Sequence, residues 1–479
     1  MQIRREAVDR SWTMKTISRT IPVVFFLLSF GIVLLTDGGV YPSSLAVAVI
    51  FMALALAVAG LLEGLHRETS GLFGFVLVLW LVLIAWTSFQ ALSLPSGLFA
   101  NPAWLSIREA GIEAPGRISV VPGDTIASLL PISLPFMTLL AALLLFRSDR
   151  QVESALQVFA LCGGAFAVFA IVQSVLFPHT LMFAPKTHYI GNLTAPFVNR
   201  NTAATFYGLV AVASIVCFAL AAASSDHRRG RSSDRQMPRR AWVFLLMALA
   251  AVVALALTRS RGGVAASFLG CGALLVTLAI HFAGKKTSLP MQSAGRKAWG
   301  RQAALALVTL AVVLVVGSLV FARAILRAEV QAIDEGRLCI IPGIWQAIRD
   351  NFILGIGSGS FRFYFPAYRD PDCGLAATWF KAHNFYLDAM LALGFLVSVA
   401  MFVAIAAMLL RVYGTGLRRR KSKKPVVLGG IAAILLVALH SFPDFSLQVP
   451  GFAMSFALFL GLTATISLNS TDRRSIRNL

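Results

Sequence analysis

Charged residues are scarce in this chain of 479 residues, since only 13% are Asp, Glu, Lys or Arg. An average soluble domain has about 25%. Mean hydropathy is +0.78, and apolar runs long enough to cross a bilayer recur along the sequence. The scarcity of charge therefore excludes a soluble globular domain and predicts an all-α, polytopic membrane protein. The short strands of alternating polarity that a membrane β-barrel requires are missing too.

Signals for metal, nucleotide and nucleic-acid binding are also missing. The segments predicted to be external hold no Cys/His cluster and no carboxylates paired at ligand spacing, so neither a metal nor another cofactor is expected. The glycine-rich segment 355–361 resembles a phosphate loop, but it has no Walker lysine, and we interpret it as a supporting turn. The net charge of +21 does not indicate nucleic-acid binding, because the basic residues form short clusters between apolar runs.

Hydropathy predicts about twelve transmembrane helices. They lie near residues 21–36, 43–62, 71–92, 125–146, 155–177, 203–223, 241–257, 263–283, 303–322, 384–410, 425–440 and 451–469. With the N-terminus in the cytoplasm, 29 of the 42 Lys and Arg residues fall in cytoplasmic segments and 13 in external ones. Every short basic loop then lies on one side, so both termini are predicted to be cytoplasmic.

The spans divide the chain into three predicted regions. Residues 1–154 hold the first four helices, residues 155–469 hold the motifs described below, and residues 470–479 form a cytoplasmic tail. A large external loop, residues 323–383, is too long to be structureless and is predicted to be a folded unit with short helices. The other long external loop, residues 93–124, contains four prolines and is interpreted as a spacer or lid.

Two cysteines, Cys339 and Cys373, fall within the large external loop. They form a disulfide if that compartment is oxidising, and otherwise they are two unrelated thiols. The other three cysteines lie in predicted spans and are interpreted as packing residues. The pattern leaves both alternatives for the loop open.

Four arginines lie on the predicted external side, near the ends of spans or in the large loop. They are Arg200, Arg259, Arg261 and Arg337. One arginine at a span end usually extends its charge into water while its stem stays in the bilayer. Several at one face instead suit the bidentate binding of phosphate. A lipid pyrophosphate would place its headgroup at this depth, and Gly262 and Gly263 would let a helix begin beside it.

His383 opens a predicted span directly after the large loop. A histidine at a helix start is often only a polar end residue, but a neutral imidazole can also accept a proton from a hydroxyl near pH 7. His440 and Asp444 are predicted on the same face and are candidates for supporting contacts to this group. The residues alone leave both interpretations of His383 open.

Five segments occur in an order and spacing that resemble the O-antigen ligase and O-antigen polymerase (Wzy-type) superfamily of bacterial envelope glycosyltransferases. They are FVNRN at 197–201, TRSRGG at 258–263, the loop elements from Gly336-Arg337 through Trp345 to GIGSGSF at 355–361, AHNFYLDAMLALG at 382–394, and HSFPDF at 440–445. The resemblance covers roughly residues 155–455, while the first four spans resemble the superfamily only in topology.

This resemblance implies a multi-pass enzyme of the bacterial inner membrane that works at the periplasmic face without a metal or nucleotide cofactor. The donor would be a glycan on undecaprenyl pyrophosphate. The acceptor would be lipid A–core for a ligase, or a growing O-antigen or exopolysaccharide chain for a polymerase. By the same resemblance, Arg337 and either Arg261 or Arg259 bind the pyrophosphate, Arg200 assists, and His383 activates the acceptor hydroxyl.

Two other classes fit the composition less well. A twelve-helix transporter of the major-facilitator type would explain the basic loop 224–240, but it should carry ionisable groups near mid-membrane and show related halves. The spans here are nearly free of charge. A scaffold membrane protein would not need an external group of arginines.

Overall fold

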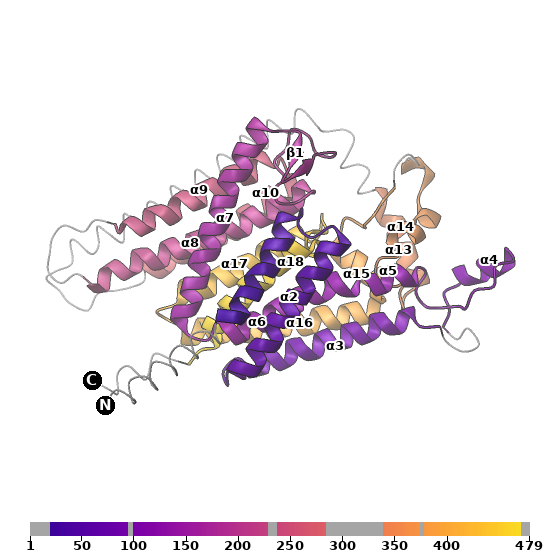
Figure 1. Ribbon diagram of the computed structural model, residues 1–479, viewed down its shortest axis with the longest axis horizontal. Helices are drawn as coiled ribbons and strands as arrows, with labels where there is room; N and C mark the ends of the chain where they lie inside the picture. Colours follow the sequence, from indigo (N-terminus) through magenta and orange to yellow (C-terminus); the bar gives the residue numbers. More distant parts are fainter. Residues whose placement is uncertain (1–19, 94–98, 229–236, 284–338, 374–377, 471–479) are drawn as a thin grey trace, which may run out of the picture.

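The computed structural model describes residues 20–93, 99–228, 237–283, 339–373 and 378–470 (Figure 1). In this part of the chain, nine helices are long and apolar enough to cross a membrane, and Thr20–Leu35 and Lys424–His440 form two shorter apolar helices. The prediction of a mostly helical multi-pass protein is confirmed. The predicted span 303–322 lies outside the described residues, so the count of twelve stays a prediction.

The nine long helices and the shorter helix α17 follow the predicted spans in order, with one predicted span divided as described below. They are α2 (Pro42–Glu63), α3 (Ser70–Ala91), α5 (Pro122–Ala127) continued by α6 (Leu129–Leu145), α7 (Asp149–Leu176), α8 (Arg200–Arg228), α9 (Arg239–Leu257), α10 (Arg261–Ala283), α16 (Phe395–Arg419), α17 (Lys424–His440) and α18 (Pro450–Leu468). Several begin with proline in the first turn, where an N–H would have no helical partner. Ser148 starts α7 through a capping box with Gln151.

Short elements connect these helices. They are α4 (Ala103–Glu109), the antiparallel strands β1 (Thr180–Leu181) and β2 (Ala184–Pro185), α13 (Ile341–Asp350), α14 (Phe361–Tyr364), the 3-10 turns η2 (Phe365–Tyr368), η3 (Pro371–Cys373) and η4 (Ser446–Gln448), and α15 (Phe385–Leu393). One of the short helices predicted in the loop 323–383 corresponds to α13.

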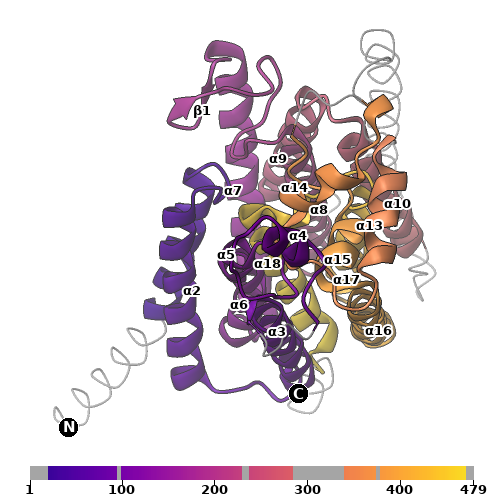
Figure 2. The same ribbon diagram turned by 90° about the vertical axis from the view of Figure 1, so that its right-hand side faces the viewer.

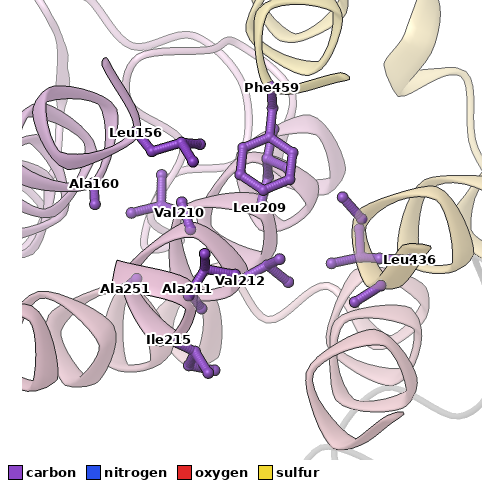
Figure 3. Close-up of a cluster of buried hydrophobic side chains, with 14 of the residues drawn as sticks. Leu156, Ala160, Leu209, Val210, Ala211, Val212, Ile215, Ala251, Leu436 and Phe459 are labelled. Carbon is purple, nitrogen blue, oxygen red and sulfur yellow. The ribbon is translucent and has the colours of Figure 1, made fainter. Parts of the chain in front are cut away.

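Helix α8 is the centre of the bundle. Residues buried inside the protein make up 89% of its apolar stretch but only 11% of that of α16, which therefore lies at the periphery. Figure 3 shows Val210, with its neighbours in α8, surrounded by side chains of α7, α9, α17 and α18 such as Leu156 and Phe459. The first residue of α8, Arg200, is consequently anchored by the most buried element described.

Glycines allow the helices around α8 to approach closely. A Cβ placed on Gly163 of α7 would lie 2.6 Å from Val210 Cγ2, and one on Gly270 of α10 would lie 2.8 Å from Leu436 Cβ. Small residues at such crossings let backbones pack without a hydrophobic driving force between helices. Gly272, in contrast, has no neighbour within 4 Å of that position, so only part of the glycine pattern marks a contact.

The predicted span 384–410 is wrong as one continuous helix, because the chain breaks at Gly394 between α15 and α16. Gly394 has a φ of +88°, a backbone conformation that favours glycine. The backbone N–H of the next residue, Phe395, donates a hydrogen bond to Phe352 O at 2.8 Å. A Cβ on Gly394 would collide with Ile353 O. The segment 352–355, which follows α13, therefore contacts the backbone at the break between α15 and α16.

The segment 355–361 acts as a close-packed junction. Ile356 N donates to Leu391 O at 3.0 Å, while Val120 N donates to Ile356 O at 3.0 Å. Gly357 has a φ of +84° and no space for a Cβ beside Thr125. The end of loop 93–124, which is predicted to be external, is thus hydrogen-bonded to this junction and does not form a free-standing spacer. Arg362 of α14 pairs with Asp124 of α5 at 3.1 Å, and the labels of these two helices lie close together in Figure 1. Figure 2 shows α13, α14 and α15 grouped together on one side of the molecule.

Hydrogen bonds and ion pairs join the helix ends at one end of the bundle, which we call the basic end. Arg420, exposed by only 1%, pairs with Asp149, and Asn469 Nδ2 donates to Asp149 Oδ1 at 2.9 Å. Arg147 pairs with Glu63 at 3.6 Å. Segments predicted to share the cytoplasmic side therefore meet, and the starts of α8 and α10 lie at the opposite end, which we call the motif end.

Candidate functional site

Three sequence motifs meet at the motif end through buried polar side chains. Asn201, near the start of α8, accepts a hydrogen bond on Oδ1 from Ser260 Oγ at 2.7 Å and donates from Nδ2 to Asp444 Oδ1 at 2.9 Å. Ser446 Oγ donates to the other oxygen of Asp444, which is fully buried. The sequence predicted that these motifs share a face, and the structure adds that they share one hydrogen-bond network.

His440 belongs to the same network and not to the surface. It exposes 2% of its area, and its Nδ1 lies 2.6 Å from Thr205 Oγ1. Thr205 Oγ1 also lies 2.9 Å from Asn201 O and 3.2 Å from Ser446 Oγ. His440 and Asp444 thus support the neighbouring elements, and a buried imidazole of this kind fixes geometry.

The turn between α9 and α10 gives its two arginines different environments. Arg259 is exposed and has a φ of +53°, and its N–H donates to Ala256 O at 3.1 Å. This is the left-handed residue that commonly ends a helix. Arg261 is half-buried and is the first residue of α10. The two positions, which are equivalent in the sequence pattern, are therefore distinct in the structure.

Ser260 positions Arg261 by capping α10. Its Oγ accepts a hydrogen bond from Gly263 N at 3.2 Å, and Val264 N donates to Ser260 O at 2.9 Å. Gly263 packs against Ala204 of α8 with no space for a Cβ between them. Helix α10 therefore begins directly beside the start of α8, which brings the segment containing Arg261 next to the one containing Arg200.

Arg200 is half-buried, and its Cζ lies 5.5 Å from the centre of the Tyr189 ring. This cation–π contact orients the guanidinium without neutralising it. The loop before α8 is also tied to the end of α9, because Leu193 N donates to Leu257 O at 3.0 Å. No pattern in the sequence marked Tyr189 as a site residue.

His383 lies between two aromatic rings beside this network. Its ring centre is 5.4 Å from that of Trp379 and 5.1 Å from that of Phe445, edge to face in both cases. It has a φ of +50° and is half-exposed. Two residues later, Phe385 N donates to Ser441 O at 2.9 Å and to Asp444 O at 3.2 Å. The backbone after His383 is thereby fixed to the HSFPDF segment.

Some predicted site residues lie outside the described part of the chain. Arg337 is among them, so its role stays a prediction. Cys339 is disulfide-bonded, whereas Cys162, Cys217 and Cys271 are free thiols. The side chain of Cys373 is not described, and its pairing with Cys339 therefore stays a prediction too.

The polar residues Ser260, Thr205 and Ser446 were missed as functional residues, although two of them lie within or directly after the motifs. The signal in the sequence is the alternation of one basic and one small polar residue, as in Arg200-Asn201 and Ser260-Arg261. At each of these helix starts, the polar neighbour points into the network. Helix-end geometry, and not hydropathy, determines which of the pair is buried.

These features define a multi-pass helical membrane protein with a buried polar network at one end of the bundle, which joins segments that carry half-buried arginines and a histidine. Residues 243–402 match the family of O-antigen ligases, which confirms the resemblance drawn from the motifs. The match includes Arg259, Arg261 and His383, and it offers no support for the transporter alternative. A comparison with curated proteins found no match to the chain.

Proposed function

We propose that this protein is a membrane glycosyltransferase of the O-antigen ligase or polymerase type. It moves a glycan from undecaprenyl pyrophosphate to a hydroxyl of an acceptor sugar at the periplasmic face of the inner membrane. The main support is the buried Ser260–Asn201–Asp444 network. It holds the segments of Arg200, Arg261 and His383 in one place, as a transfer between two large substrates requires.

In this proposal Arg261 binds the pyrophosphate together with Arg200 and Arg337, and Arg259 shapes the turn. Arg261 is half-buried at the start of a capped helix, whereas Arg259 is exposed in a left-handed backbone conformation. An arginine whose position is fixed before the reaction stabilises developing charge better than a freely rotating one. The preference for Arg261 rests on this difference.

The transfer proceeds as a substitution at the anomeric carbon of the donor. The acceptor oxygen forms a bond to that carbon while the bond to the pyrophosphate oxygen breaks. The proton of the acceptor hydroxyl passes to the His383 imidazole, and the bond's electron pair leaves with the pyrophosphate. Arginine charges stabilise the anion that forms, so we propose that no metal ion is needed.

The energy for the reaction is stored in the pyrophosphate ester, which explains why nucleotide-binding motifs are not required. The acceptor decides between the two activities, namely lipid A–core for a ligase and a growing polysaccharide chain for a polymerase. Both would use the same arginines and histidine. The buried network supports the shared chemistry and favours neither acceptor.

Deletion of the gene, followed by analysis of envelope polysaccharides, tests the function. Loss of glycan on lipid A–core with accumulation of lipid-linked polymer identifies a ligase. Single repeat units in place of long chains identify a polymerase. Complementation with the wild-type gene should restore the profile, while Arg261→Ala should not, even though the variant inserts into the membrane. An unchanged profile after deletion contradicts the proposal.

A further inference from the structure

Lys186 is a buried cation in the loop between α7 and α8. It exposes 9% of its surface, and its Nζ donates a hydrogen bond to Asn192 O. Among the described residues, no carboxylate lies within ion-pair distance of this ammonium group. Burial also lowers the pKa of Lys186, because loss of hydration disfavours the charged form. A carbonyl alone compensates poorly for a buried charge, so this position is costly.

The loop that holds Lys186 also contacts the helix ends that carry site arginines. Lys186 Nζ donates to the carbonyl of the Asn192–Leu193 peptide group. The N–H of the same peptide group, Leu193 N, donates to Leu257 O at 3.0 Å. Leu257 is the last residue of α9, two residues before Arg259. Tyr189 lies between Lys186 and Asn192 in the chain, and its ring supports the Arg200 guanidinium at 5.5 Å. One loop thus presents Lys186 and contacts both arginine-bearing helix ends.

This corner of the protein has an excess of positive charge. The segments 177–200 and 258–263 contain no Asp or Glu. The buried Asp444 is already engaged by Asn201 and Ser446. In addition, the Arg200 Nε is buried and has no hydrogen-bond partner within the described residues. An anion that entered here would meet a buried ammonium and a buried guanidinium donor.

We propose that Lys186 and Arg200 form a phosphate-binding subsite beside the α9–α10 turn. Lysine supplies a compact positive charge and arginine a planar fork, and together they suit a phosphate group. Pyrophosphate as the ligand rests on the proposed function, in which this subsite would hold one phosphate of the lipid donor. The shared chemistry is that of a lipid phosphate, which a phospholipid headgroup also carries.

The test uses the full chain in nanodiscs of phosphatidylcholine, with inorganic pyrophosphate as the probe and thermal unfolding as the readout. The variants are Lys186→Met, Lys186→Arg and the control Arg108→Met, which removes an exposed cation of α4. Lys186→Met should bind pyrophosphate about 10- to 100-fold more weakly than the wild type, because it loses one charge-assisted hydrogen bond. Lys186→Arg should stay within about threefold of the wild type, and Arg108→Met should match it.

The unfolding temperature of the ligand-free variant shows whether Lys186 binds the ligand or only stabilises the fold. Replacing a buried cation by an apolar side chain of similar length removes its desolvation cost, so ligand-free Lys186→Met should unfold no earlier than the wild type. The subsite is refuted if the wild type binds pyrophosphate and this variant binds it equally well, or if the wild type is stabilised by neither pyrophosphate nor phosphatidylglycerol. It is also refuted if the variant only loses stability and keeps the same pyrophosphate affinity.

A second set of nanodiscs containing phosphatidylglycerol distinguishes the source of the phosphate. In one outcome the wild type does not bind pyrophosphate but is stabilised by phosphatidylglycerol, and Lys186→Met lacks this stabilisation. The subsite then stands, with a phospholipid headgroup as its ligand. Pyrophosphate binding through Lys186, combined with an unchanged envelope after gene deletion, refutes the proposed function and leaves the subsite standing. Normal glycan transfer and normal pyrophosphate binding in Lys186→Met refute the subsite alone.

Discussion

Asn201 donates a hydrogen bond to Asp444 at 2.9 Å across 243 positions of sequence, and it accepts one from Ser260 at 2.7 Å. One amide therefore joins α8, the α9–α10 turn and the segment after α17. The neighbours of Asn201 and Ser260 in the chain are Arg200 and Arg261. The network is positioned to fix the backbones of these two arginines, whose side chains are half-buried.

Replacing Asp444 by Asn should disturb this network without changing its shape. An amide presents a donor where one of the two incoming donors needs an acceptor, which costs about 1–3 kcal/mol for a buried group. We expect a lower unfolding temperature and at least about tenfold slower glycan transfer, since poorly oriented groups lose catalytic effect. Kinetics of transfer and thermal unfolding in detergent measure both effects.

The matched control for this substitution is Asp372→Asn, an exposed carboxylate in η3. It should transfer and unfold like the wild type. Wild-type transfer by Asp444→Asn would show that the network is not needed to position the site.

The two arginines of the turn should respond differently to substitution. Arg261→Ala removes the proposed pyrophosphate ligand and should slow transfer about 10²- to 10³-fold, the usual cost of losing one preorganised donor. Arg259→Gly should transfer normally and be at least as stable as the wild type, because glycine adopts a positive φ without strain. Steady-state transfer rates with a lipid-linked donor provide the measurement. The assignment fails if Arg259→Gly is the more damaging change.

His383 can be tested with a side chain that tolerates its backbone. Asn is one of the few residues that adopt a φ near the +50° observed here, so His383→Asn should fold normally. It removes the imidazole that accepts the proton, and a general base is typically worth about 10²- to 10⁴-fold in rate. We expect a loss of this size with unchanged donor binding.

His179→Asn is the control for that experiment, since His179 is an exposed residue of the loop before α8. Rates in His383→Asn close to those of the control would mean that another group accepts the proton.

The sequence predicted the helices well, because an apolar run long enough to cross a bilayer is a local property. The break at Gly394 could not be predicted in this way, since apolar residues continue on both sides of it and the cause is a distant backbone carbonyl, Ile353 O. The motif residues were found from their charges. The roles of Ser260 and Thr205 were not found, because the sequence around a hydroxyl residue near a helix start is the same whether the hydroxyl faces water or a buried polar group.

A fourth prediction concerns the buried ion pair of the basic end. Arg420 exposes 1% of its surface and pairs with Asp149. Removing Arg420 leaves the partly buried carboxylate of Asp149 without its cation, so Arg420→Met should lower stability by about 1–3 kcal/mol. Lys423→Met breaks the half-buried pair with Glu153 and should cost at most about 1 kcal/mol. The fraction folded after heating, measured by size-exclusion chromatography, ranks the two variants.

The double variant Arg420→Met/Asp149→Leu sharpens the same prediction. It removes both charges and should recover part of the lost stability, because a buried pair and its apolar replacement are often close in free energy. Transfer per folded molecule should stay at the wild-type level in all three variants, since the basic end lies opposite the arginines of the motif end. Reduced transfer in a fully folded Arg420→Met protein would instead mean that the ion pair is coupled to the site through α17 or α18.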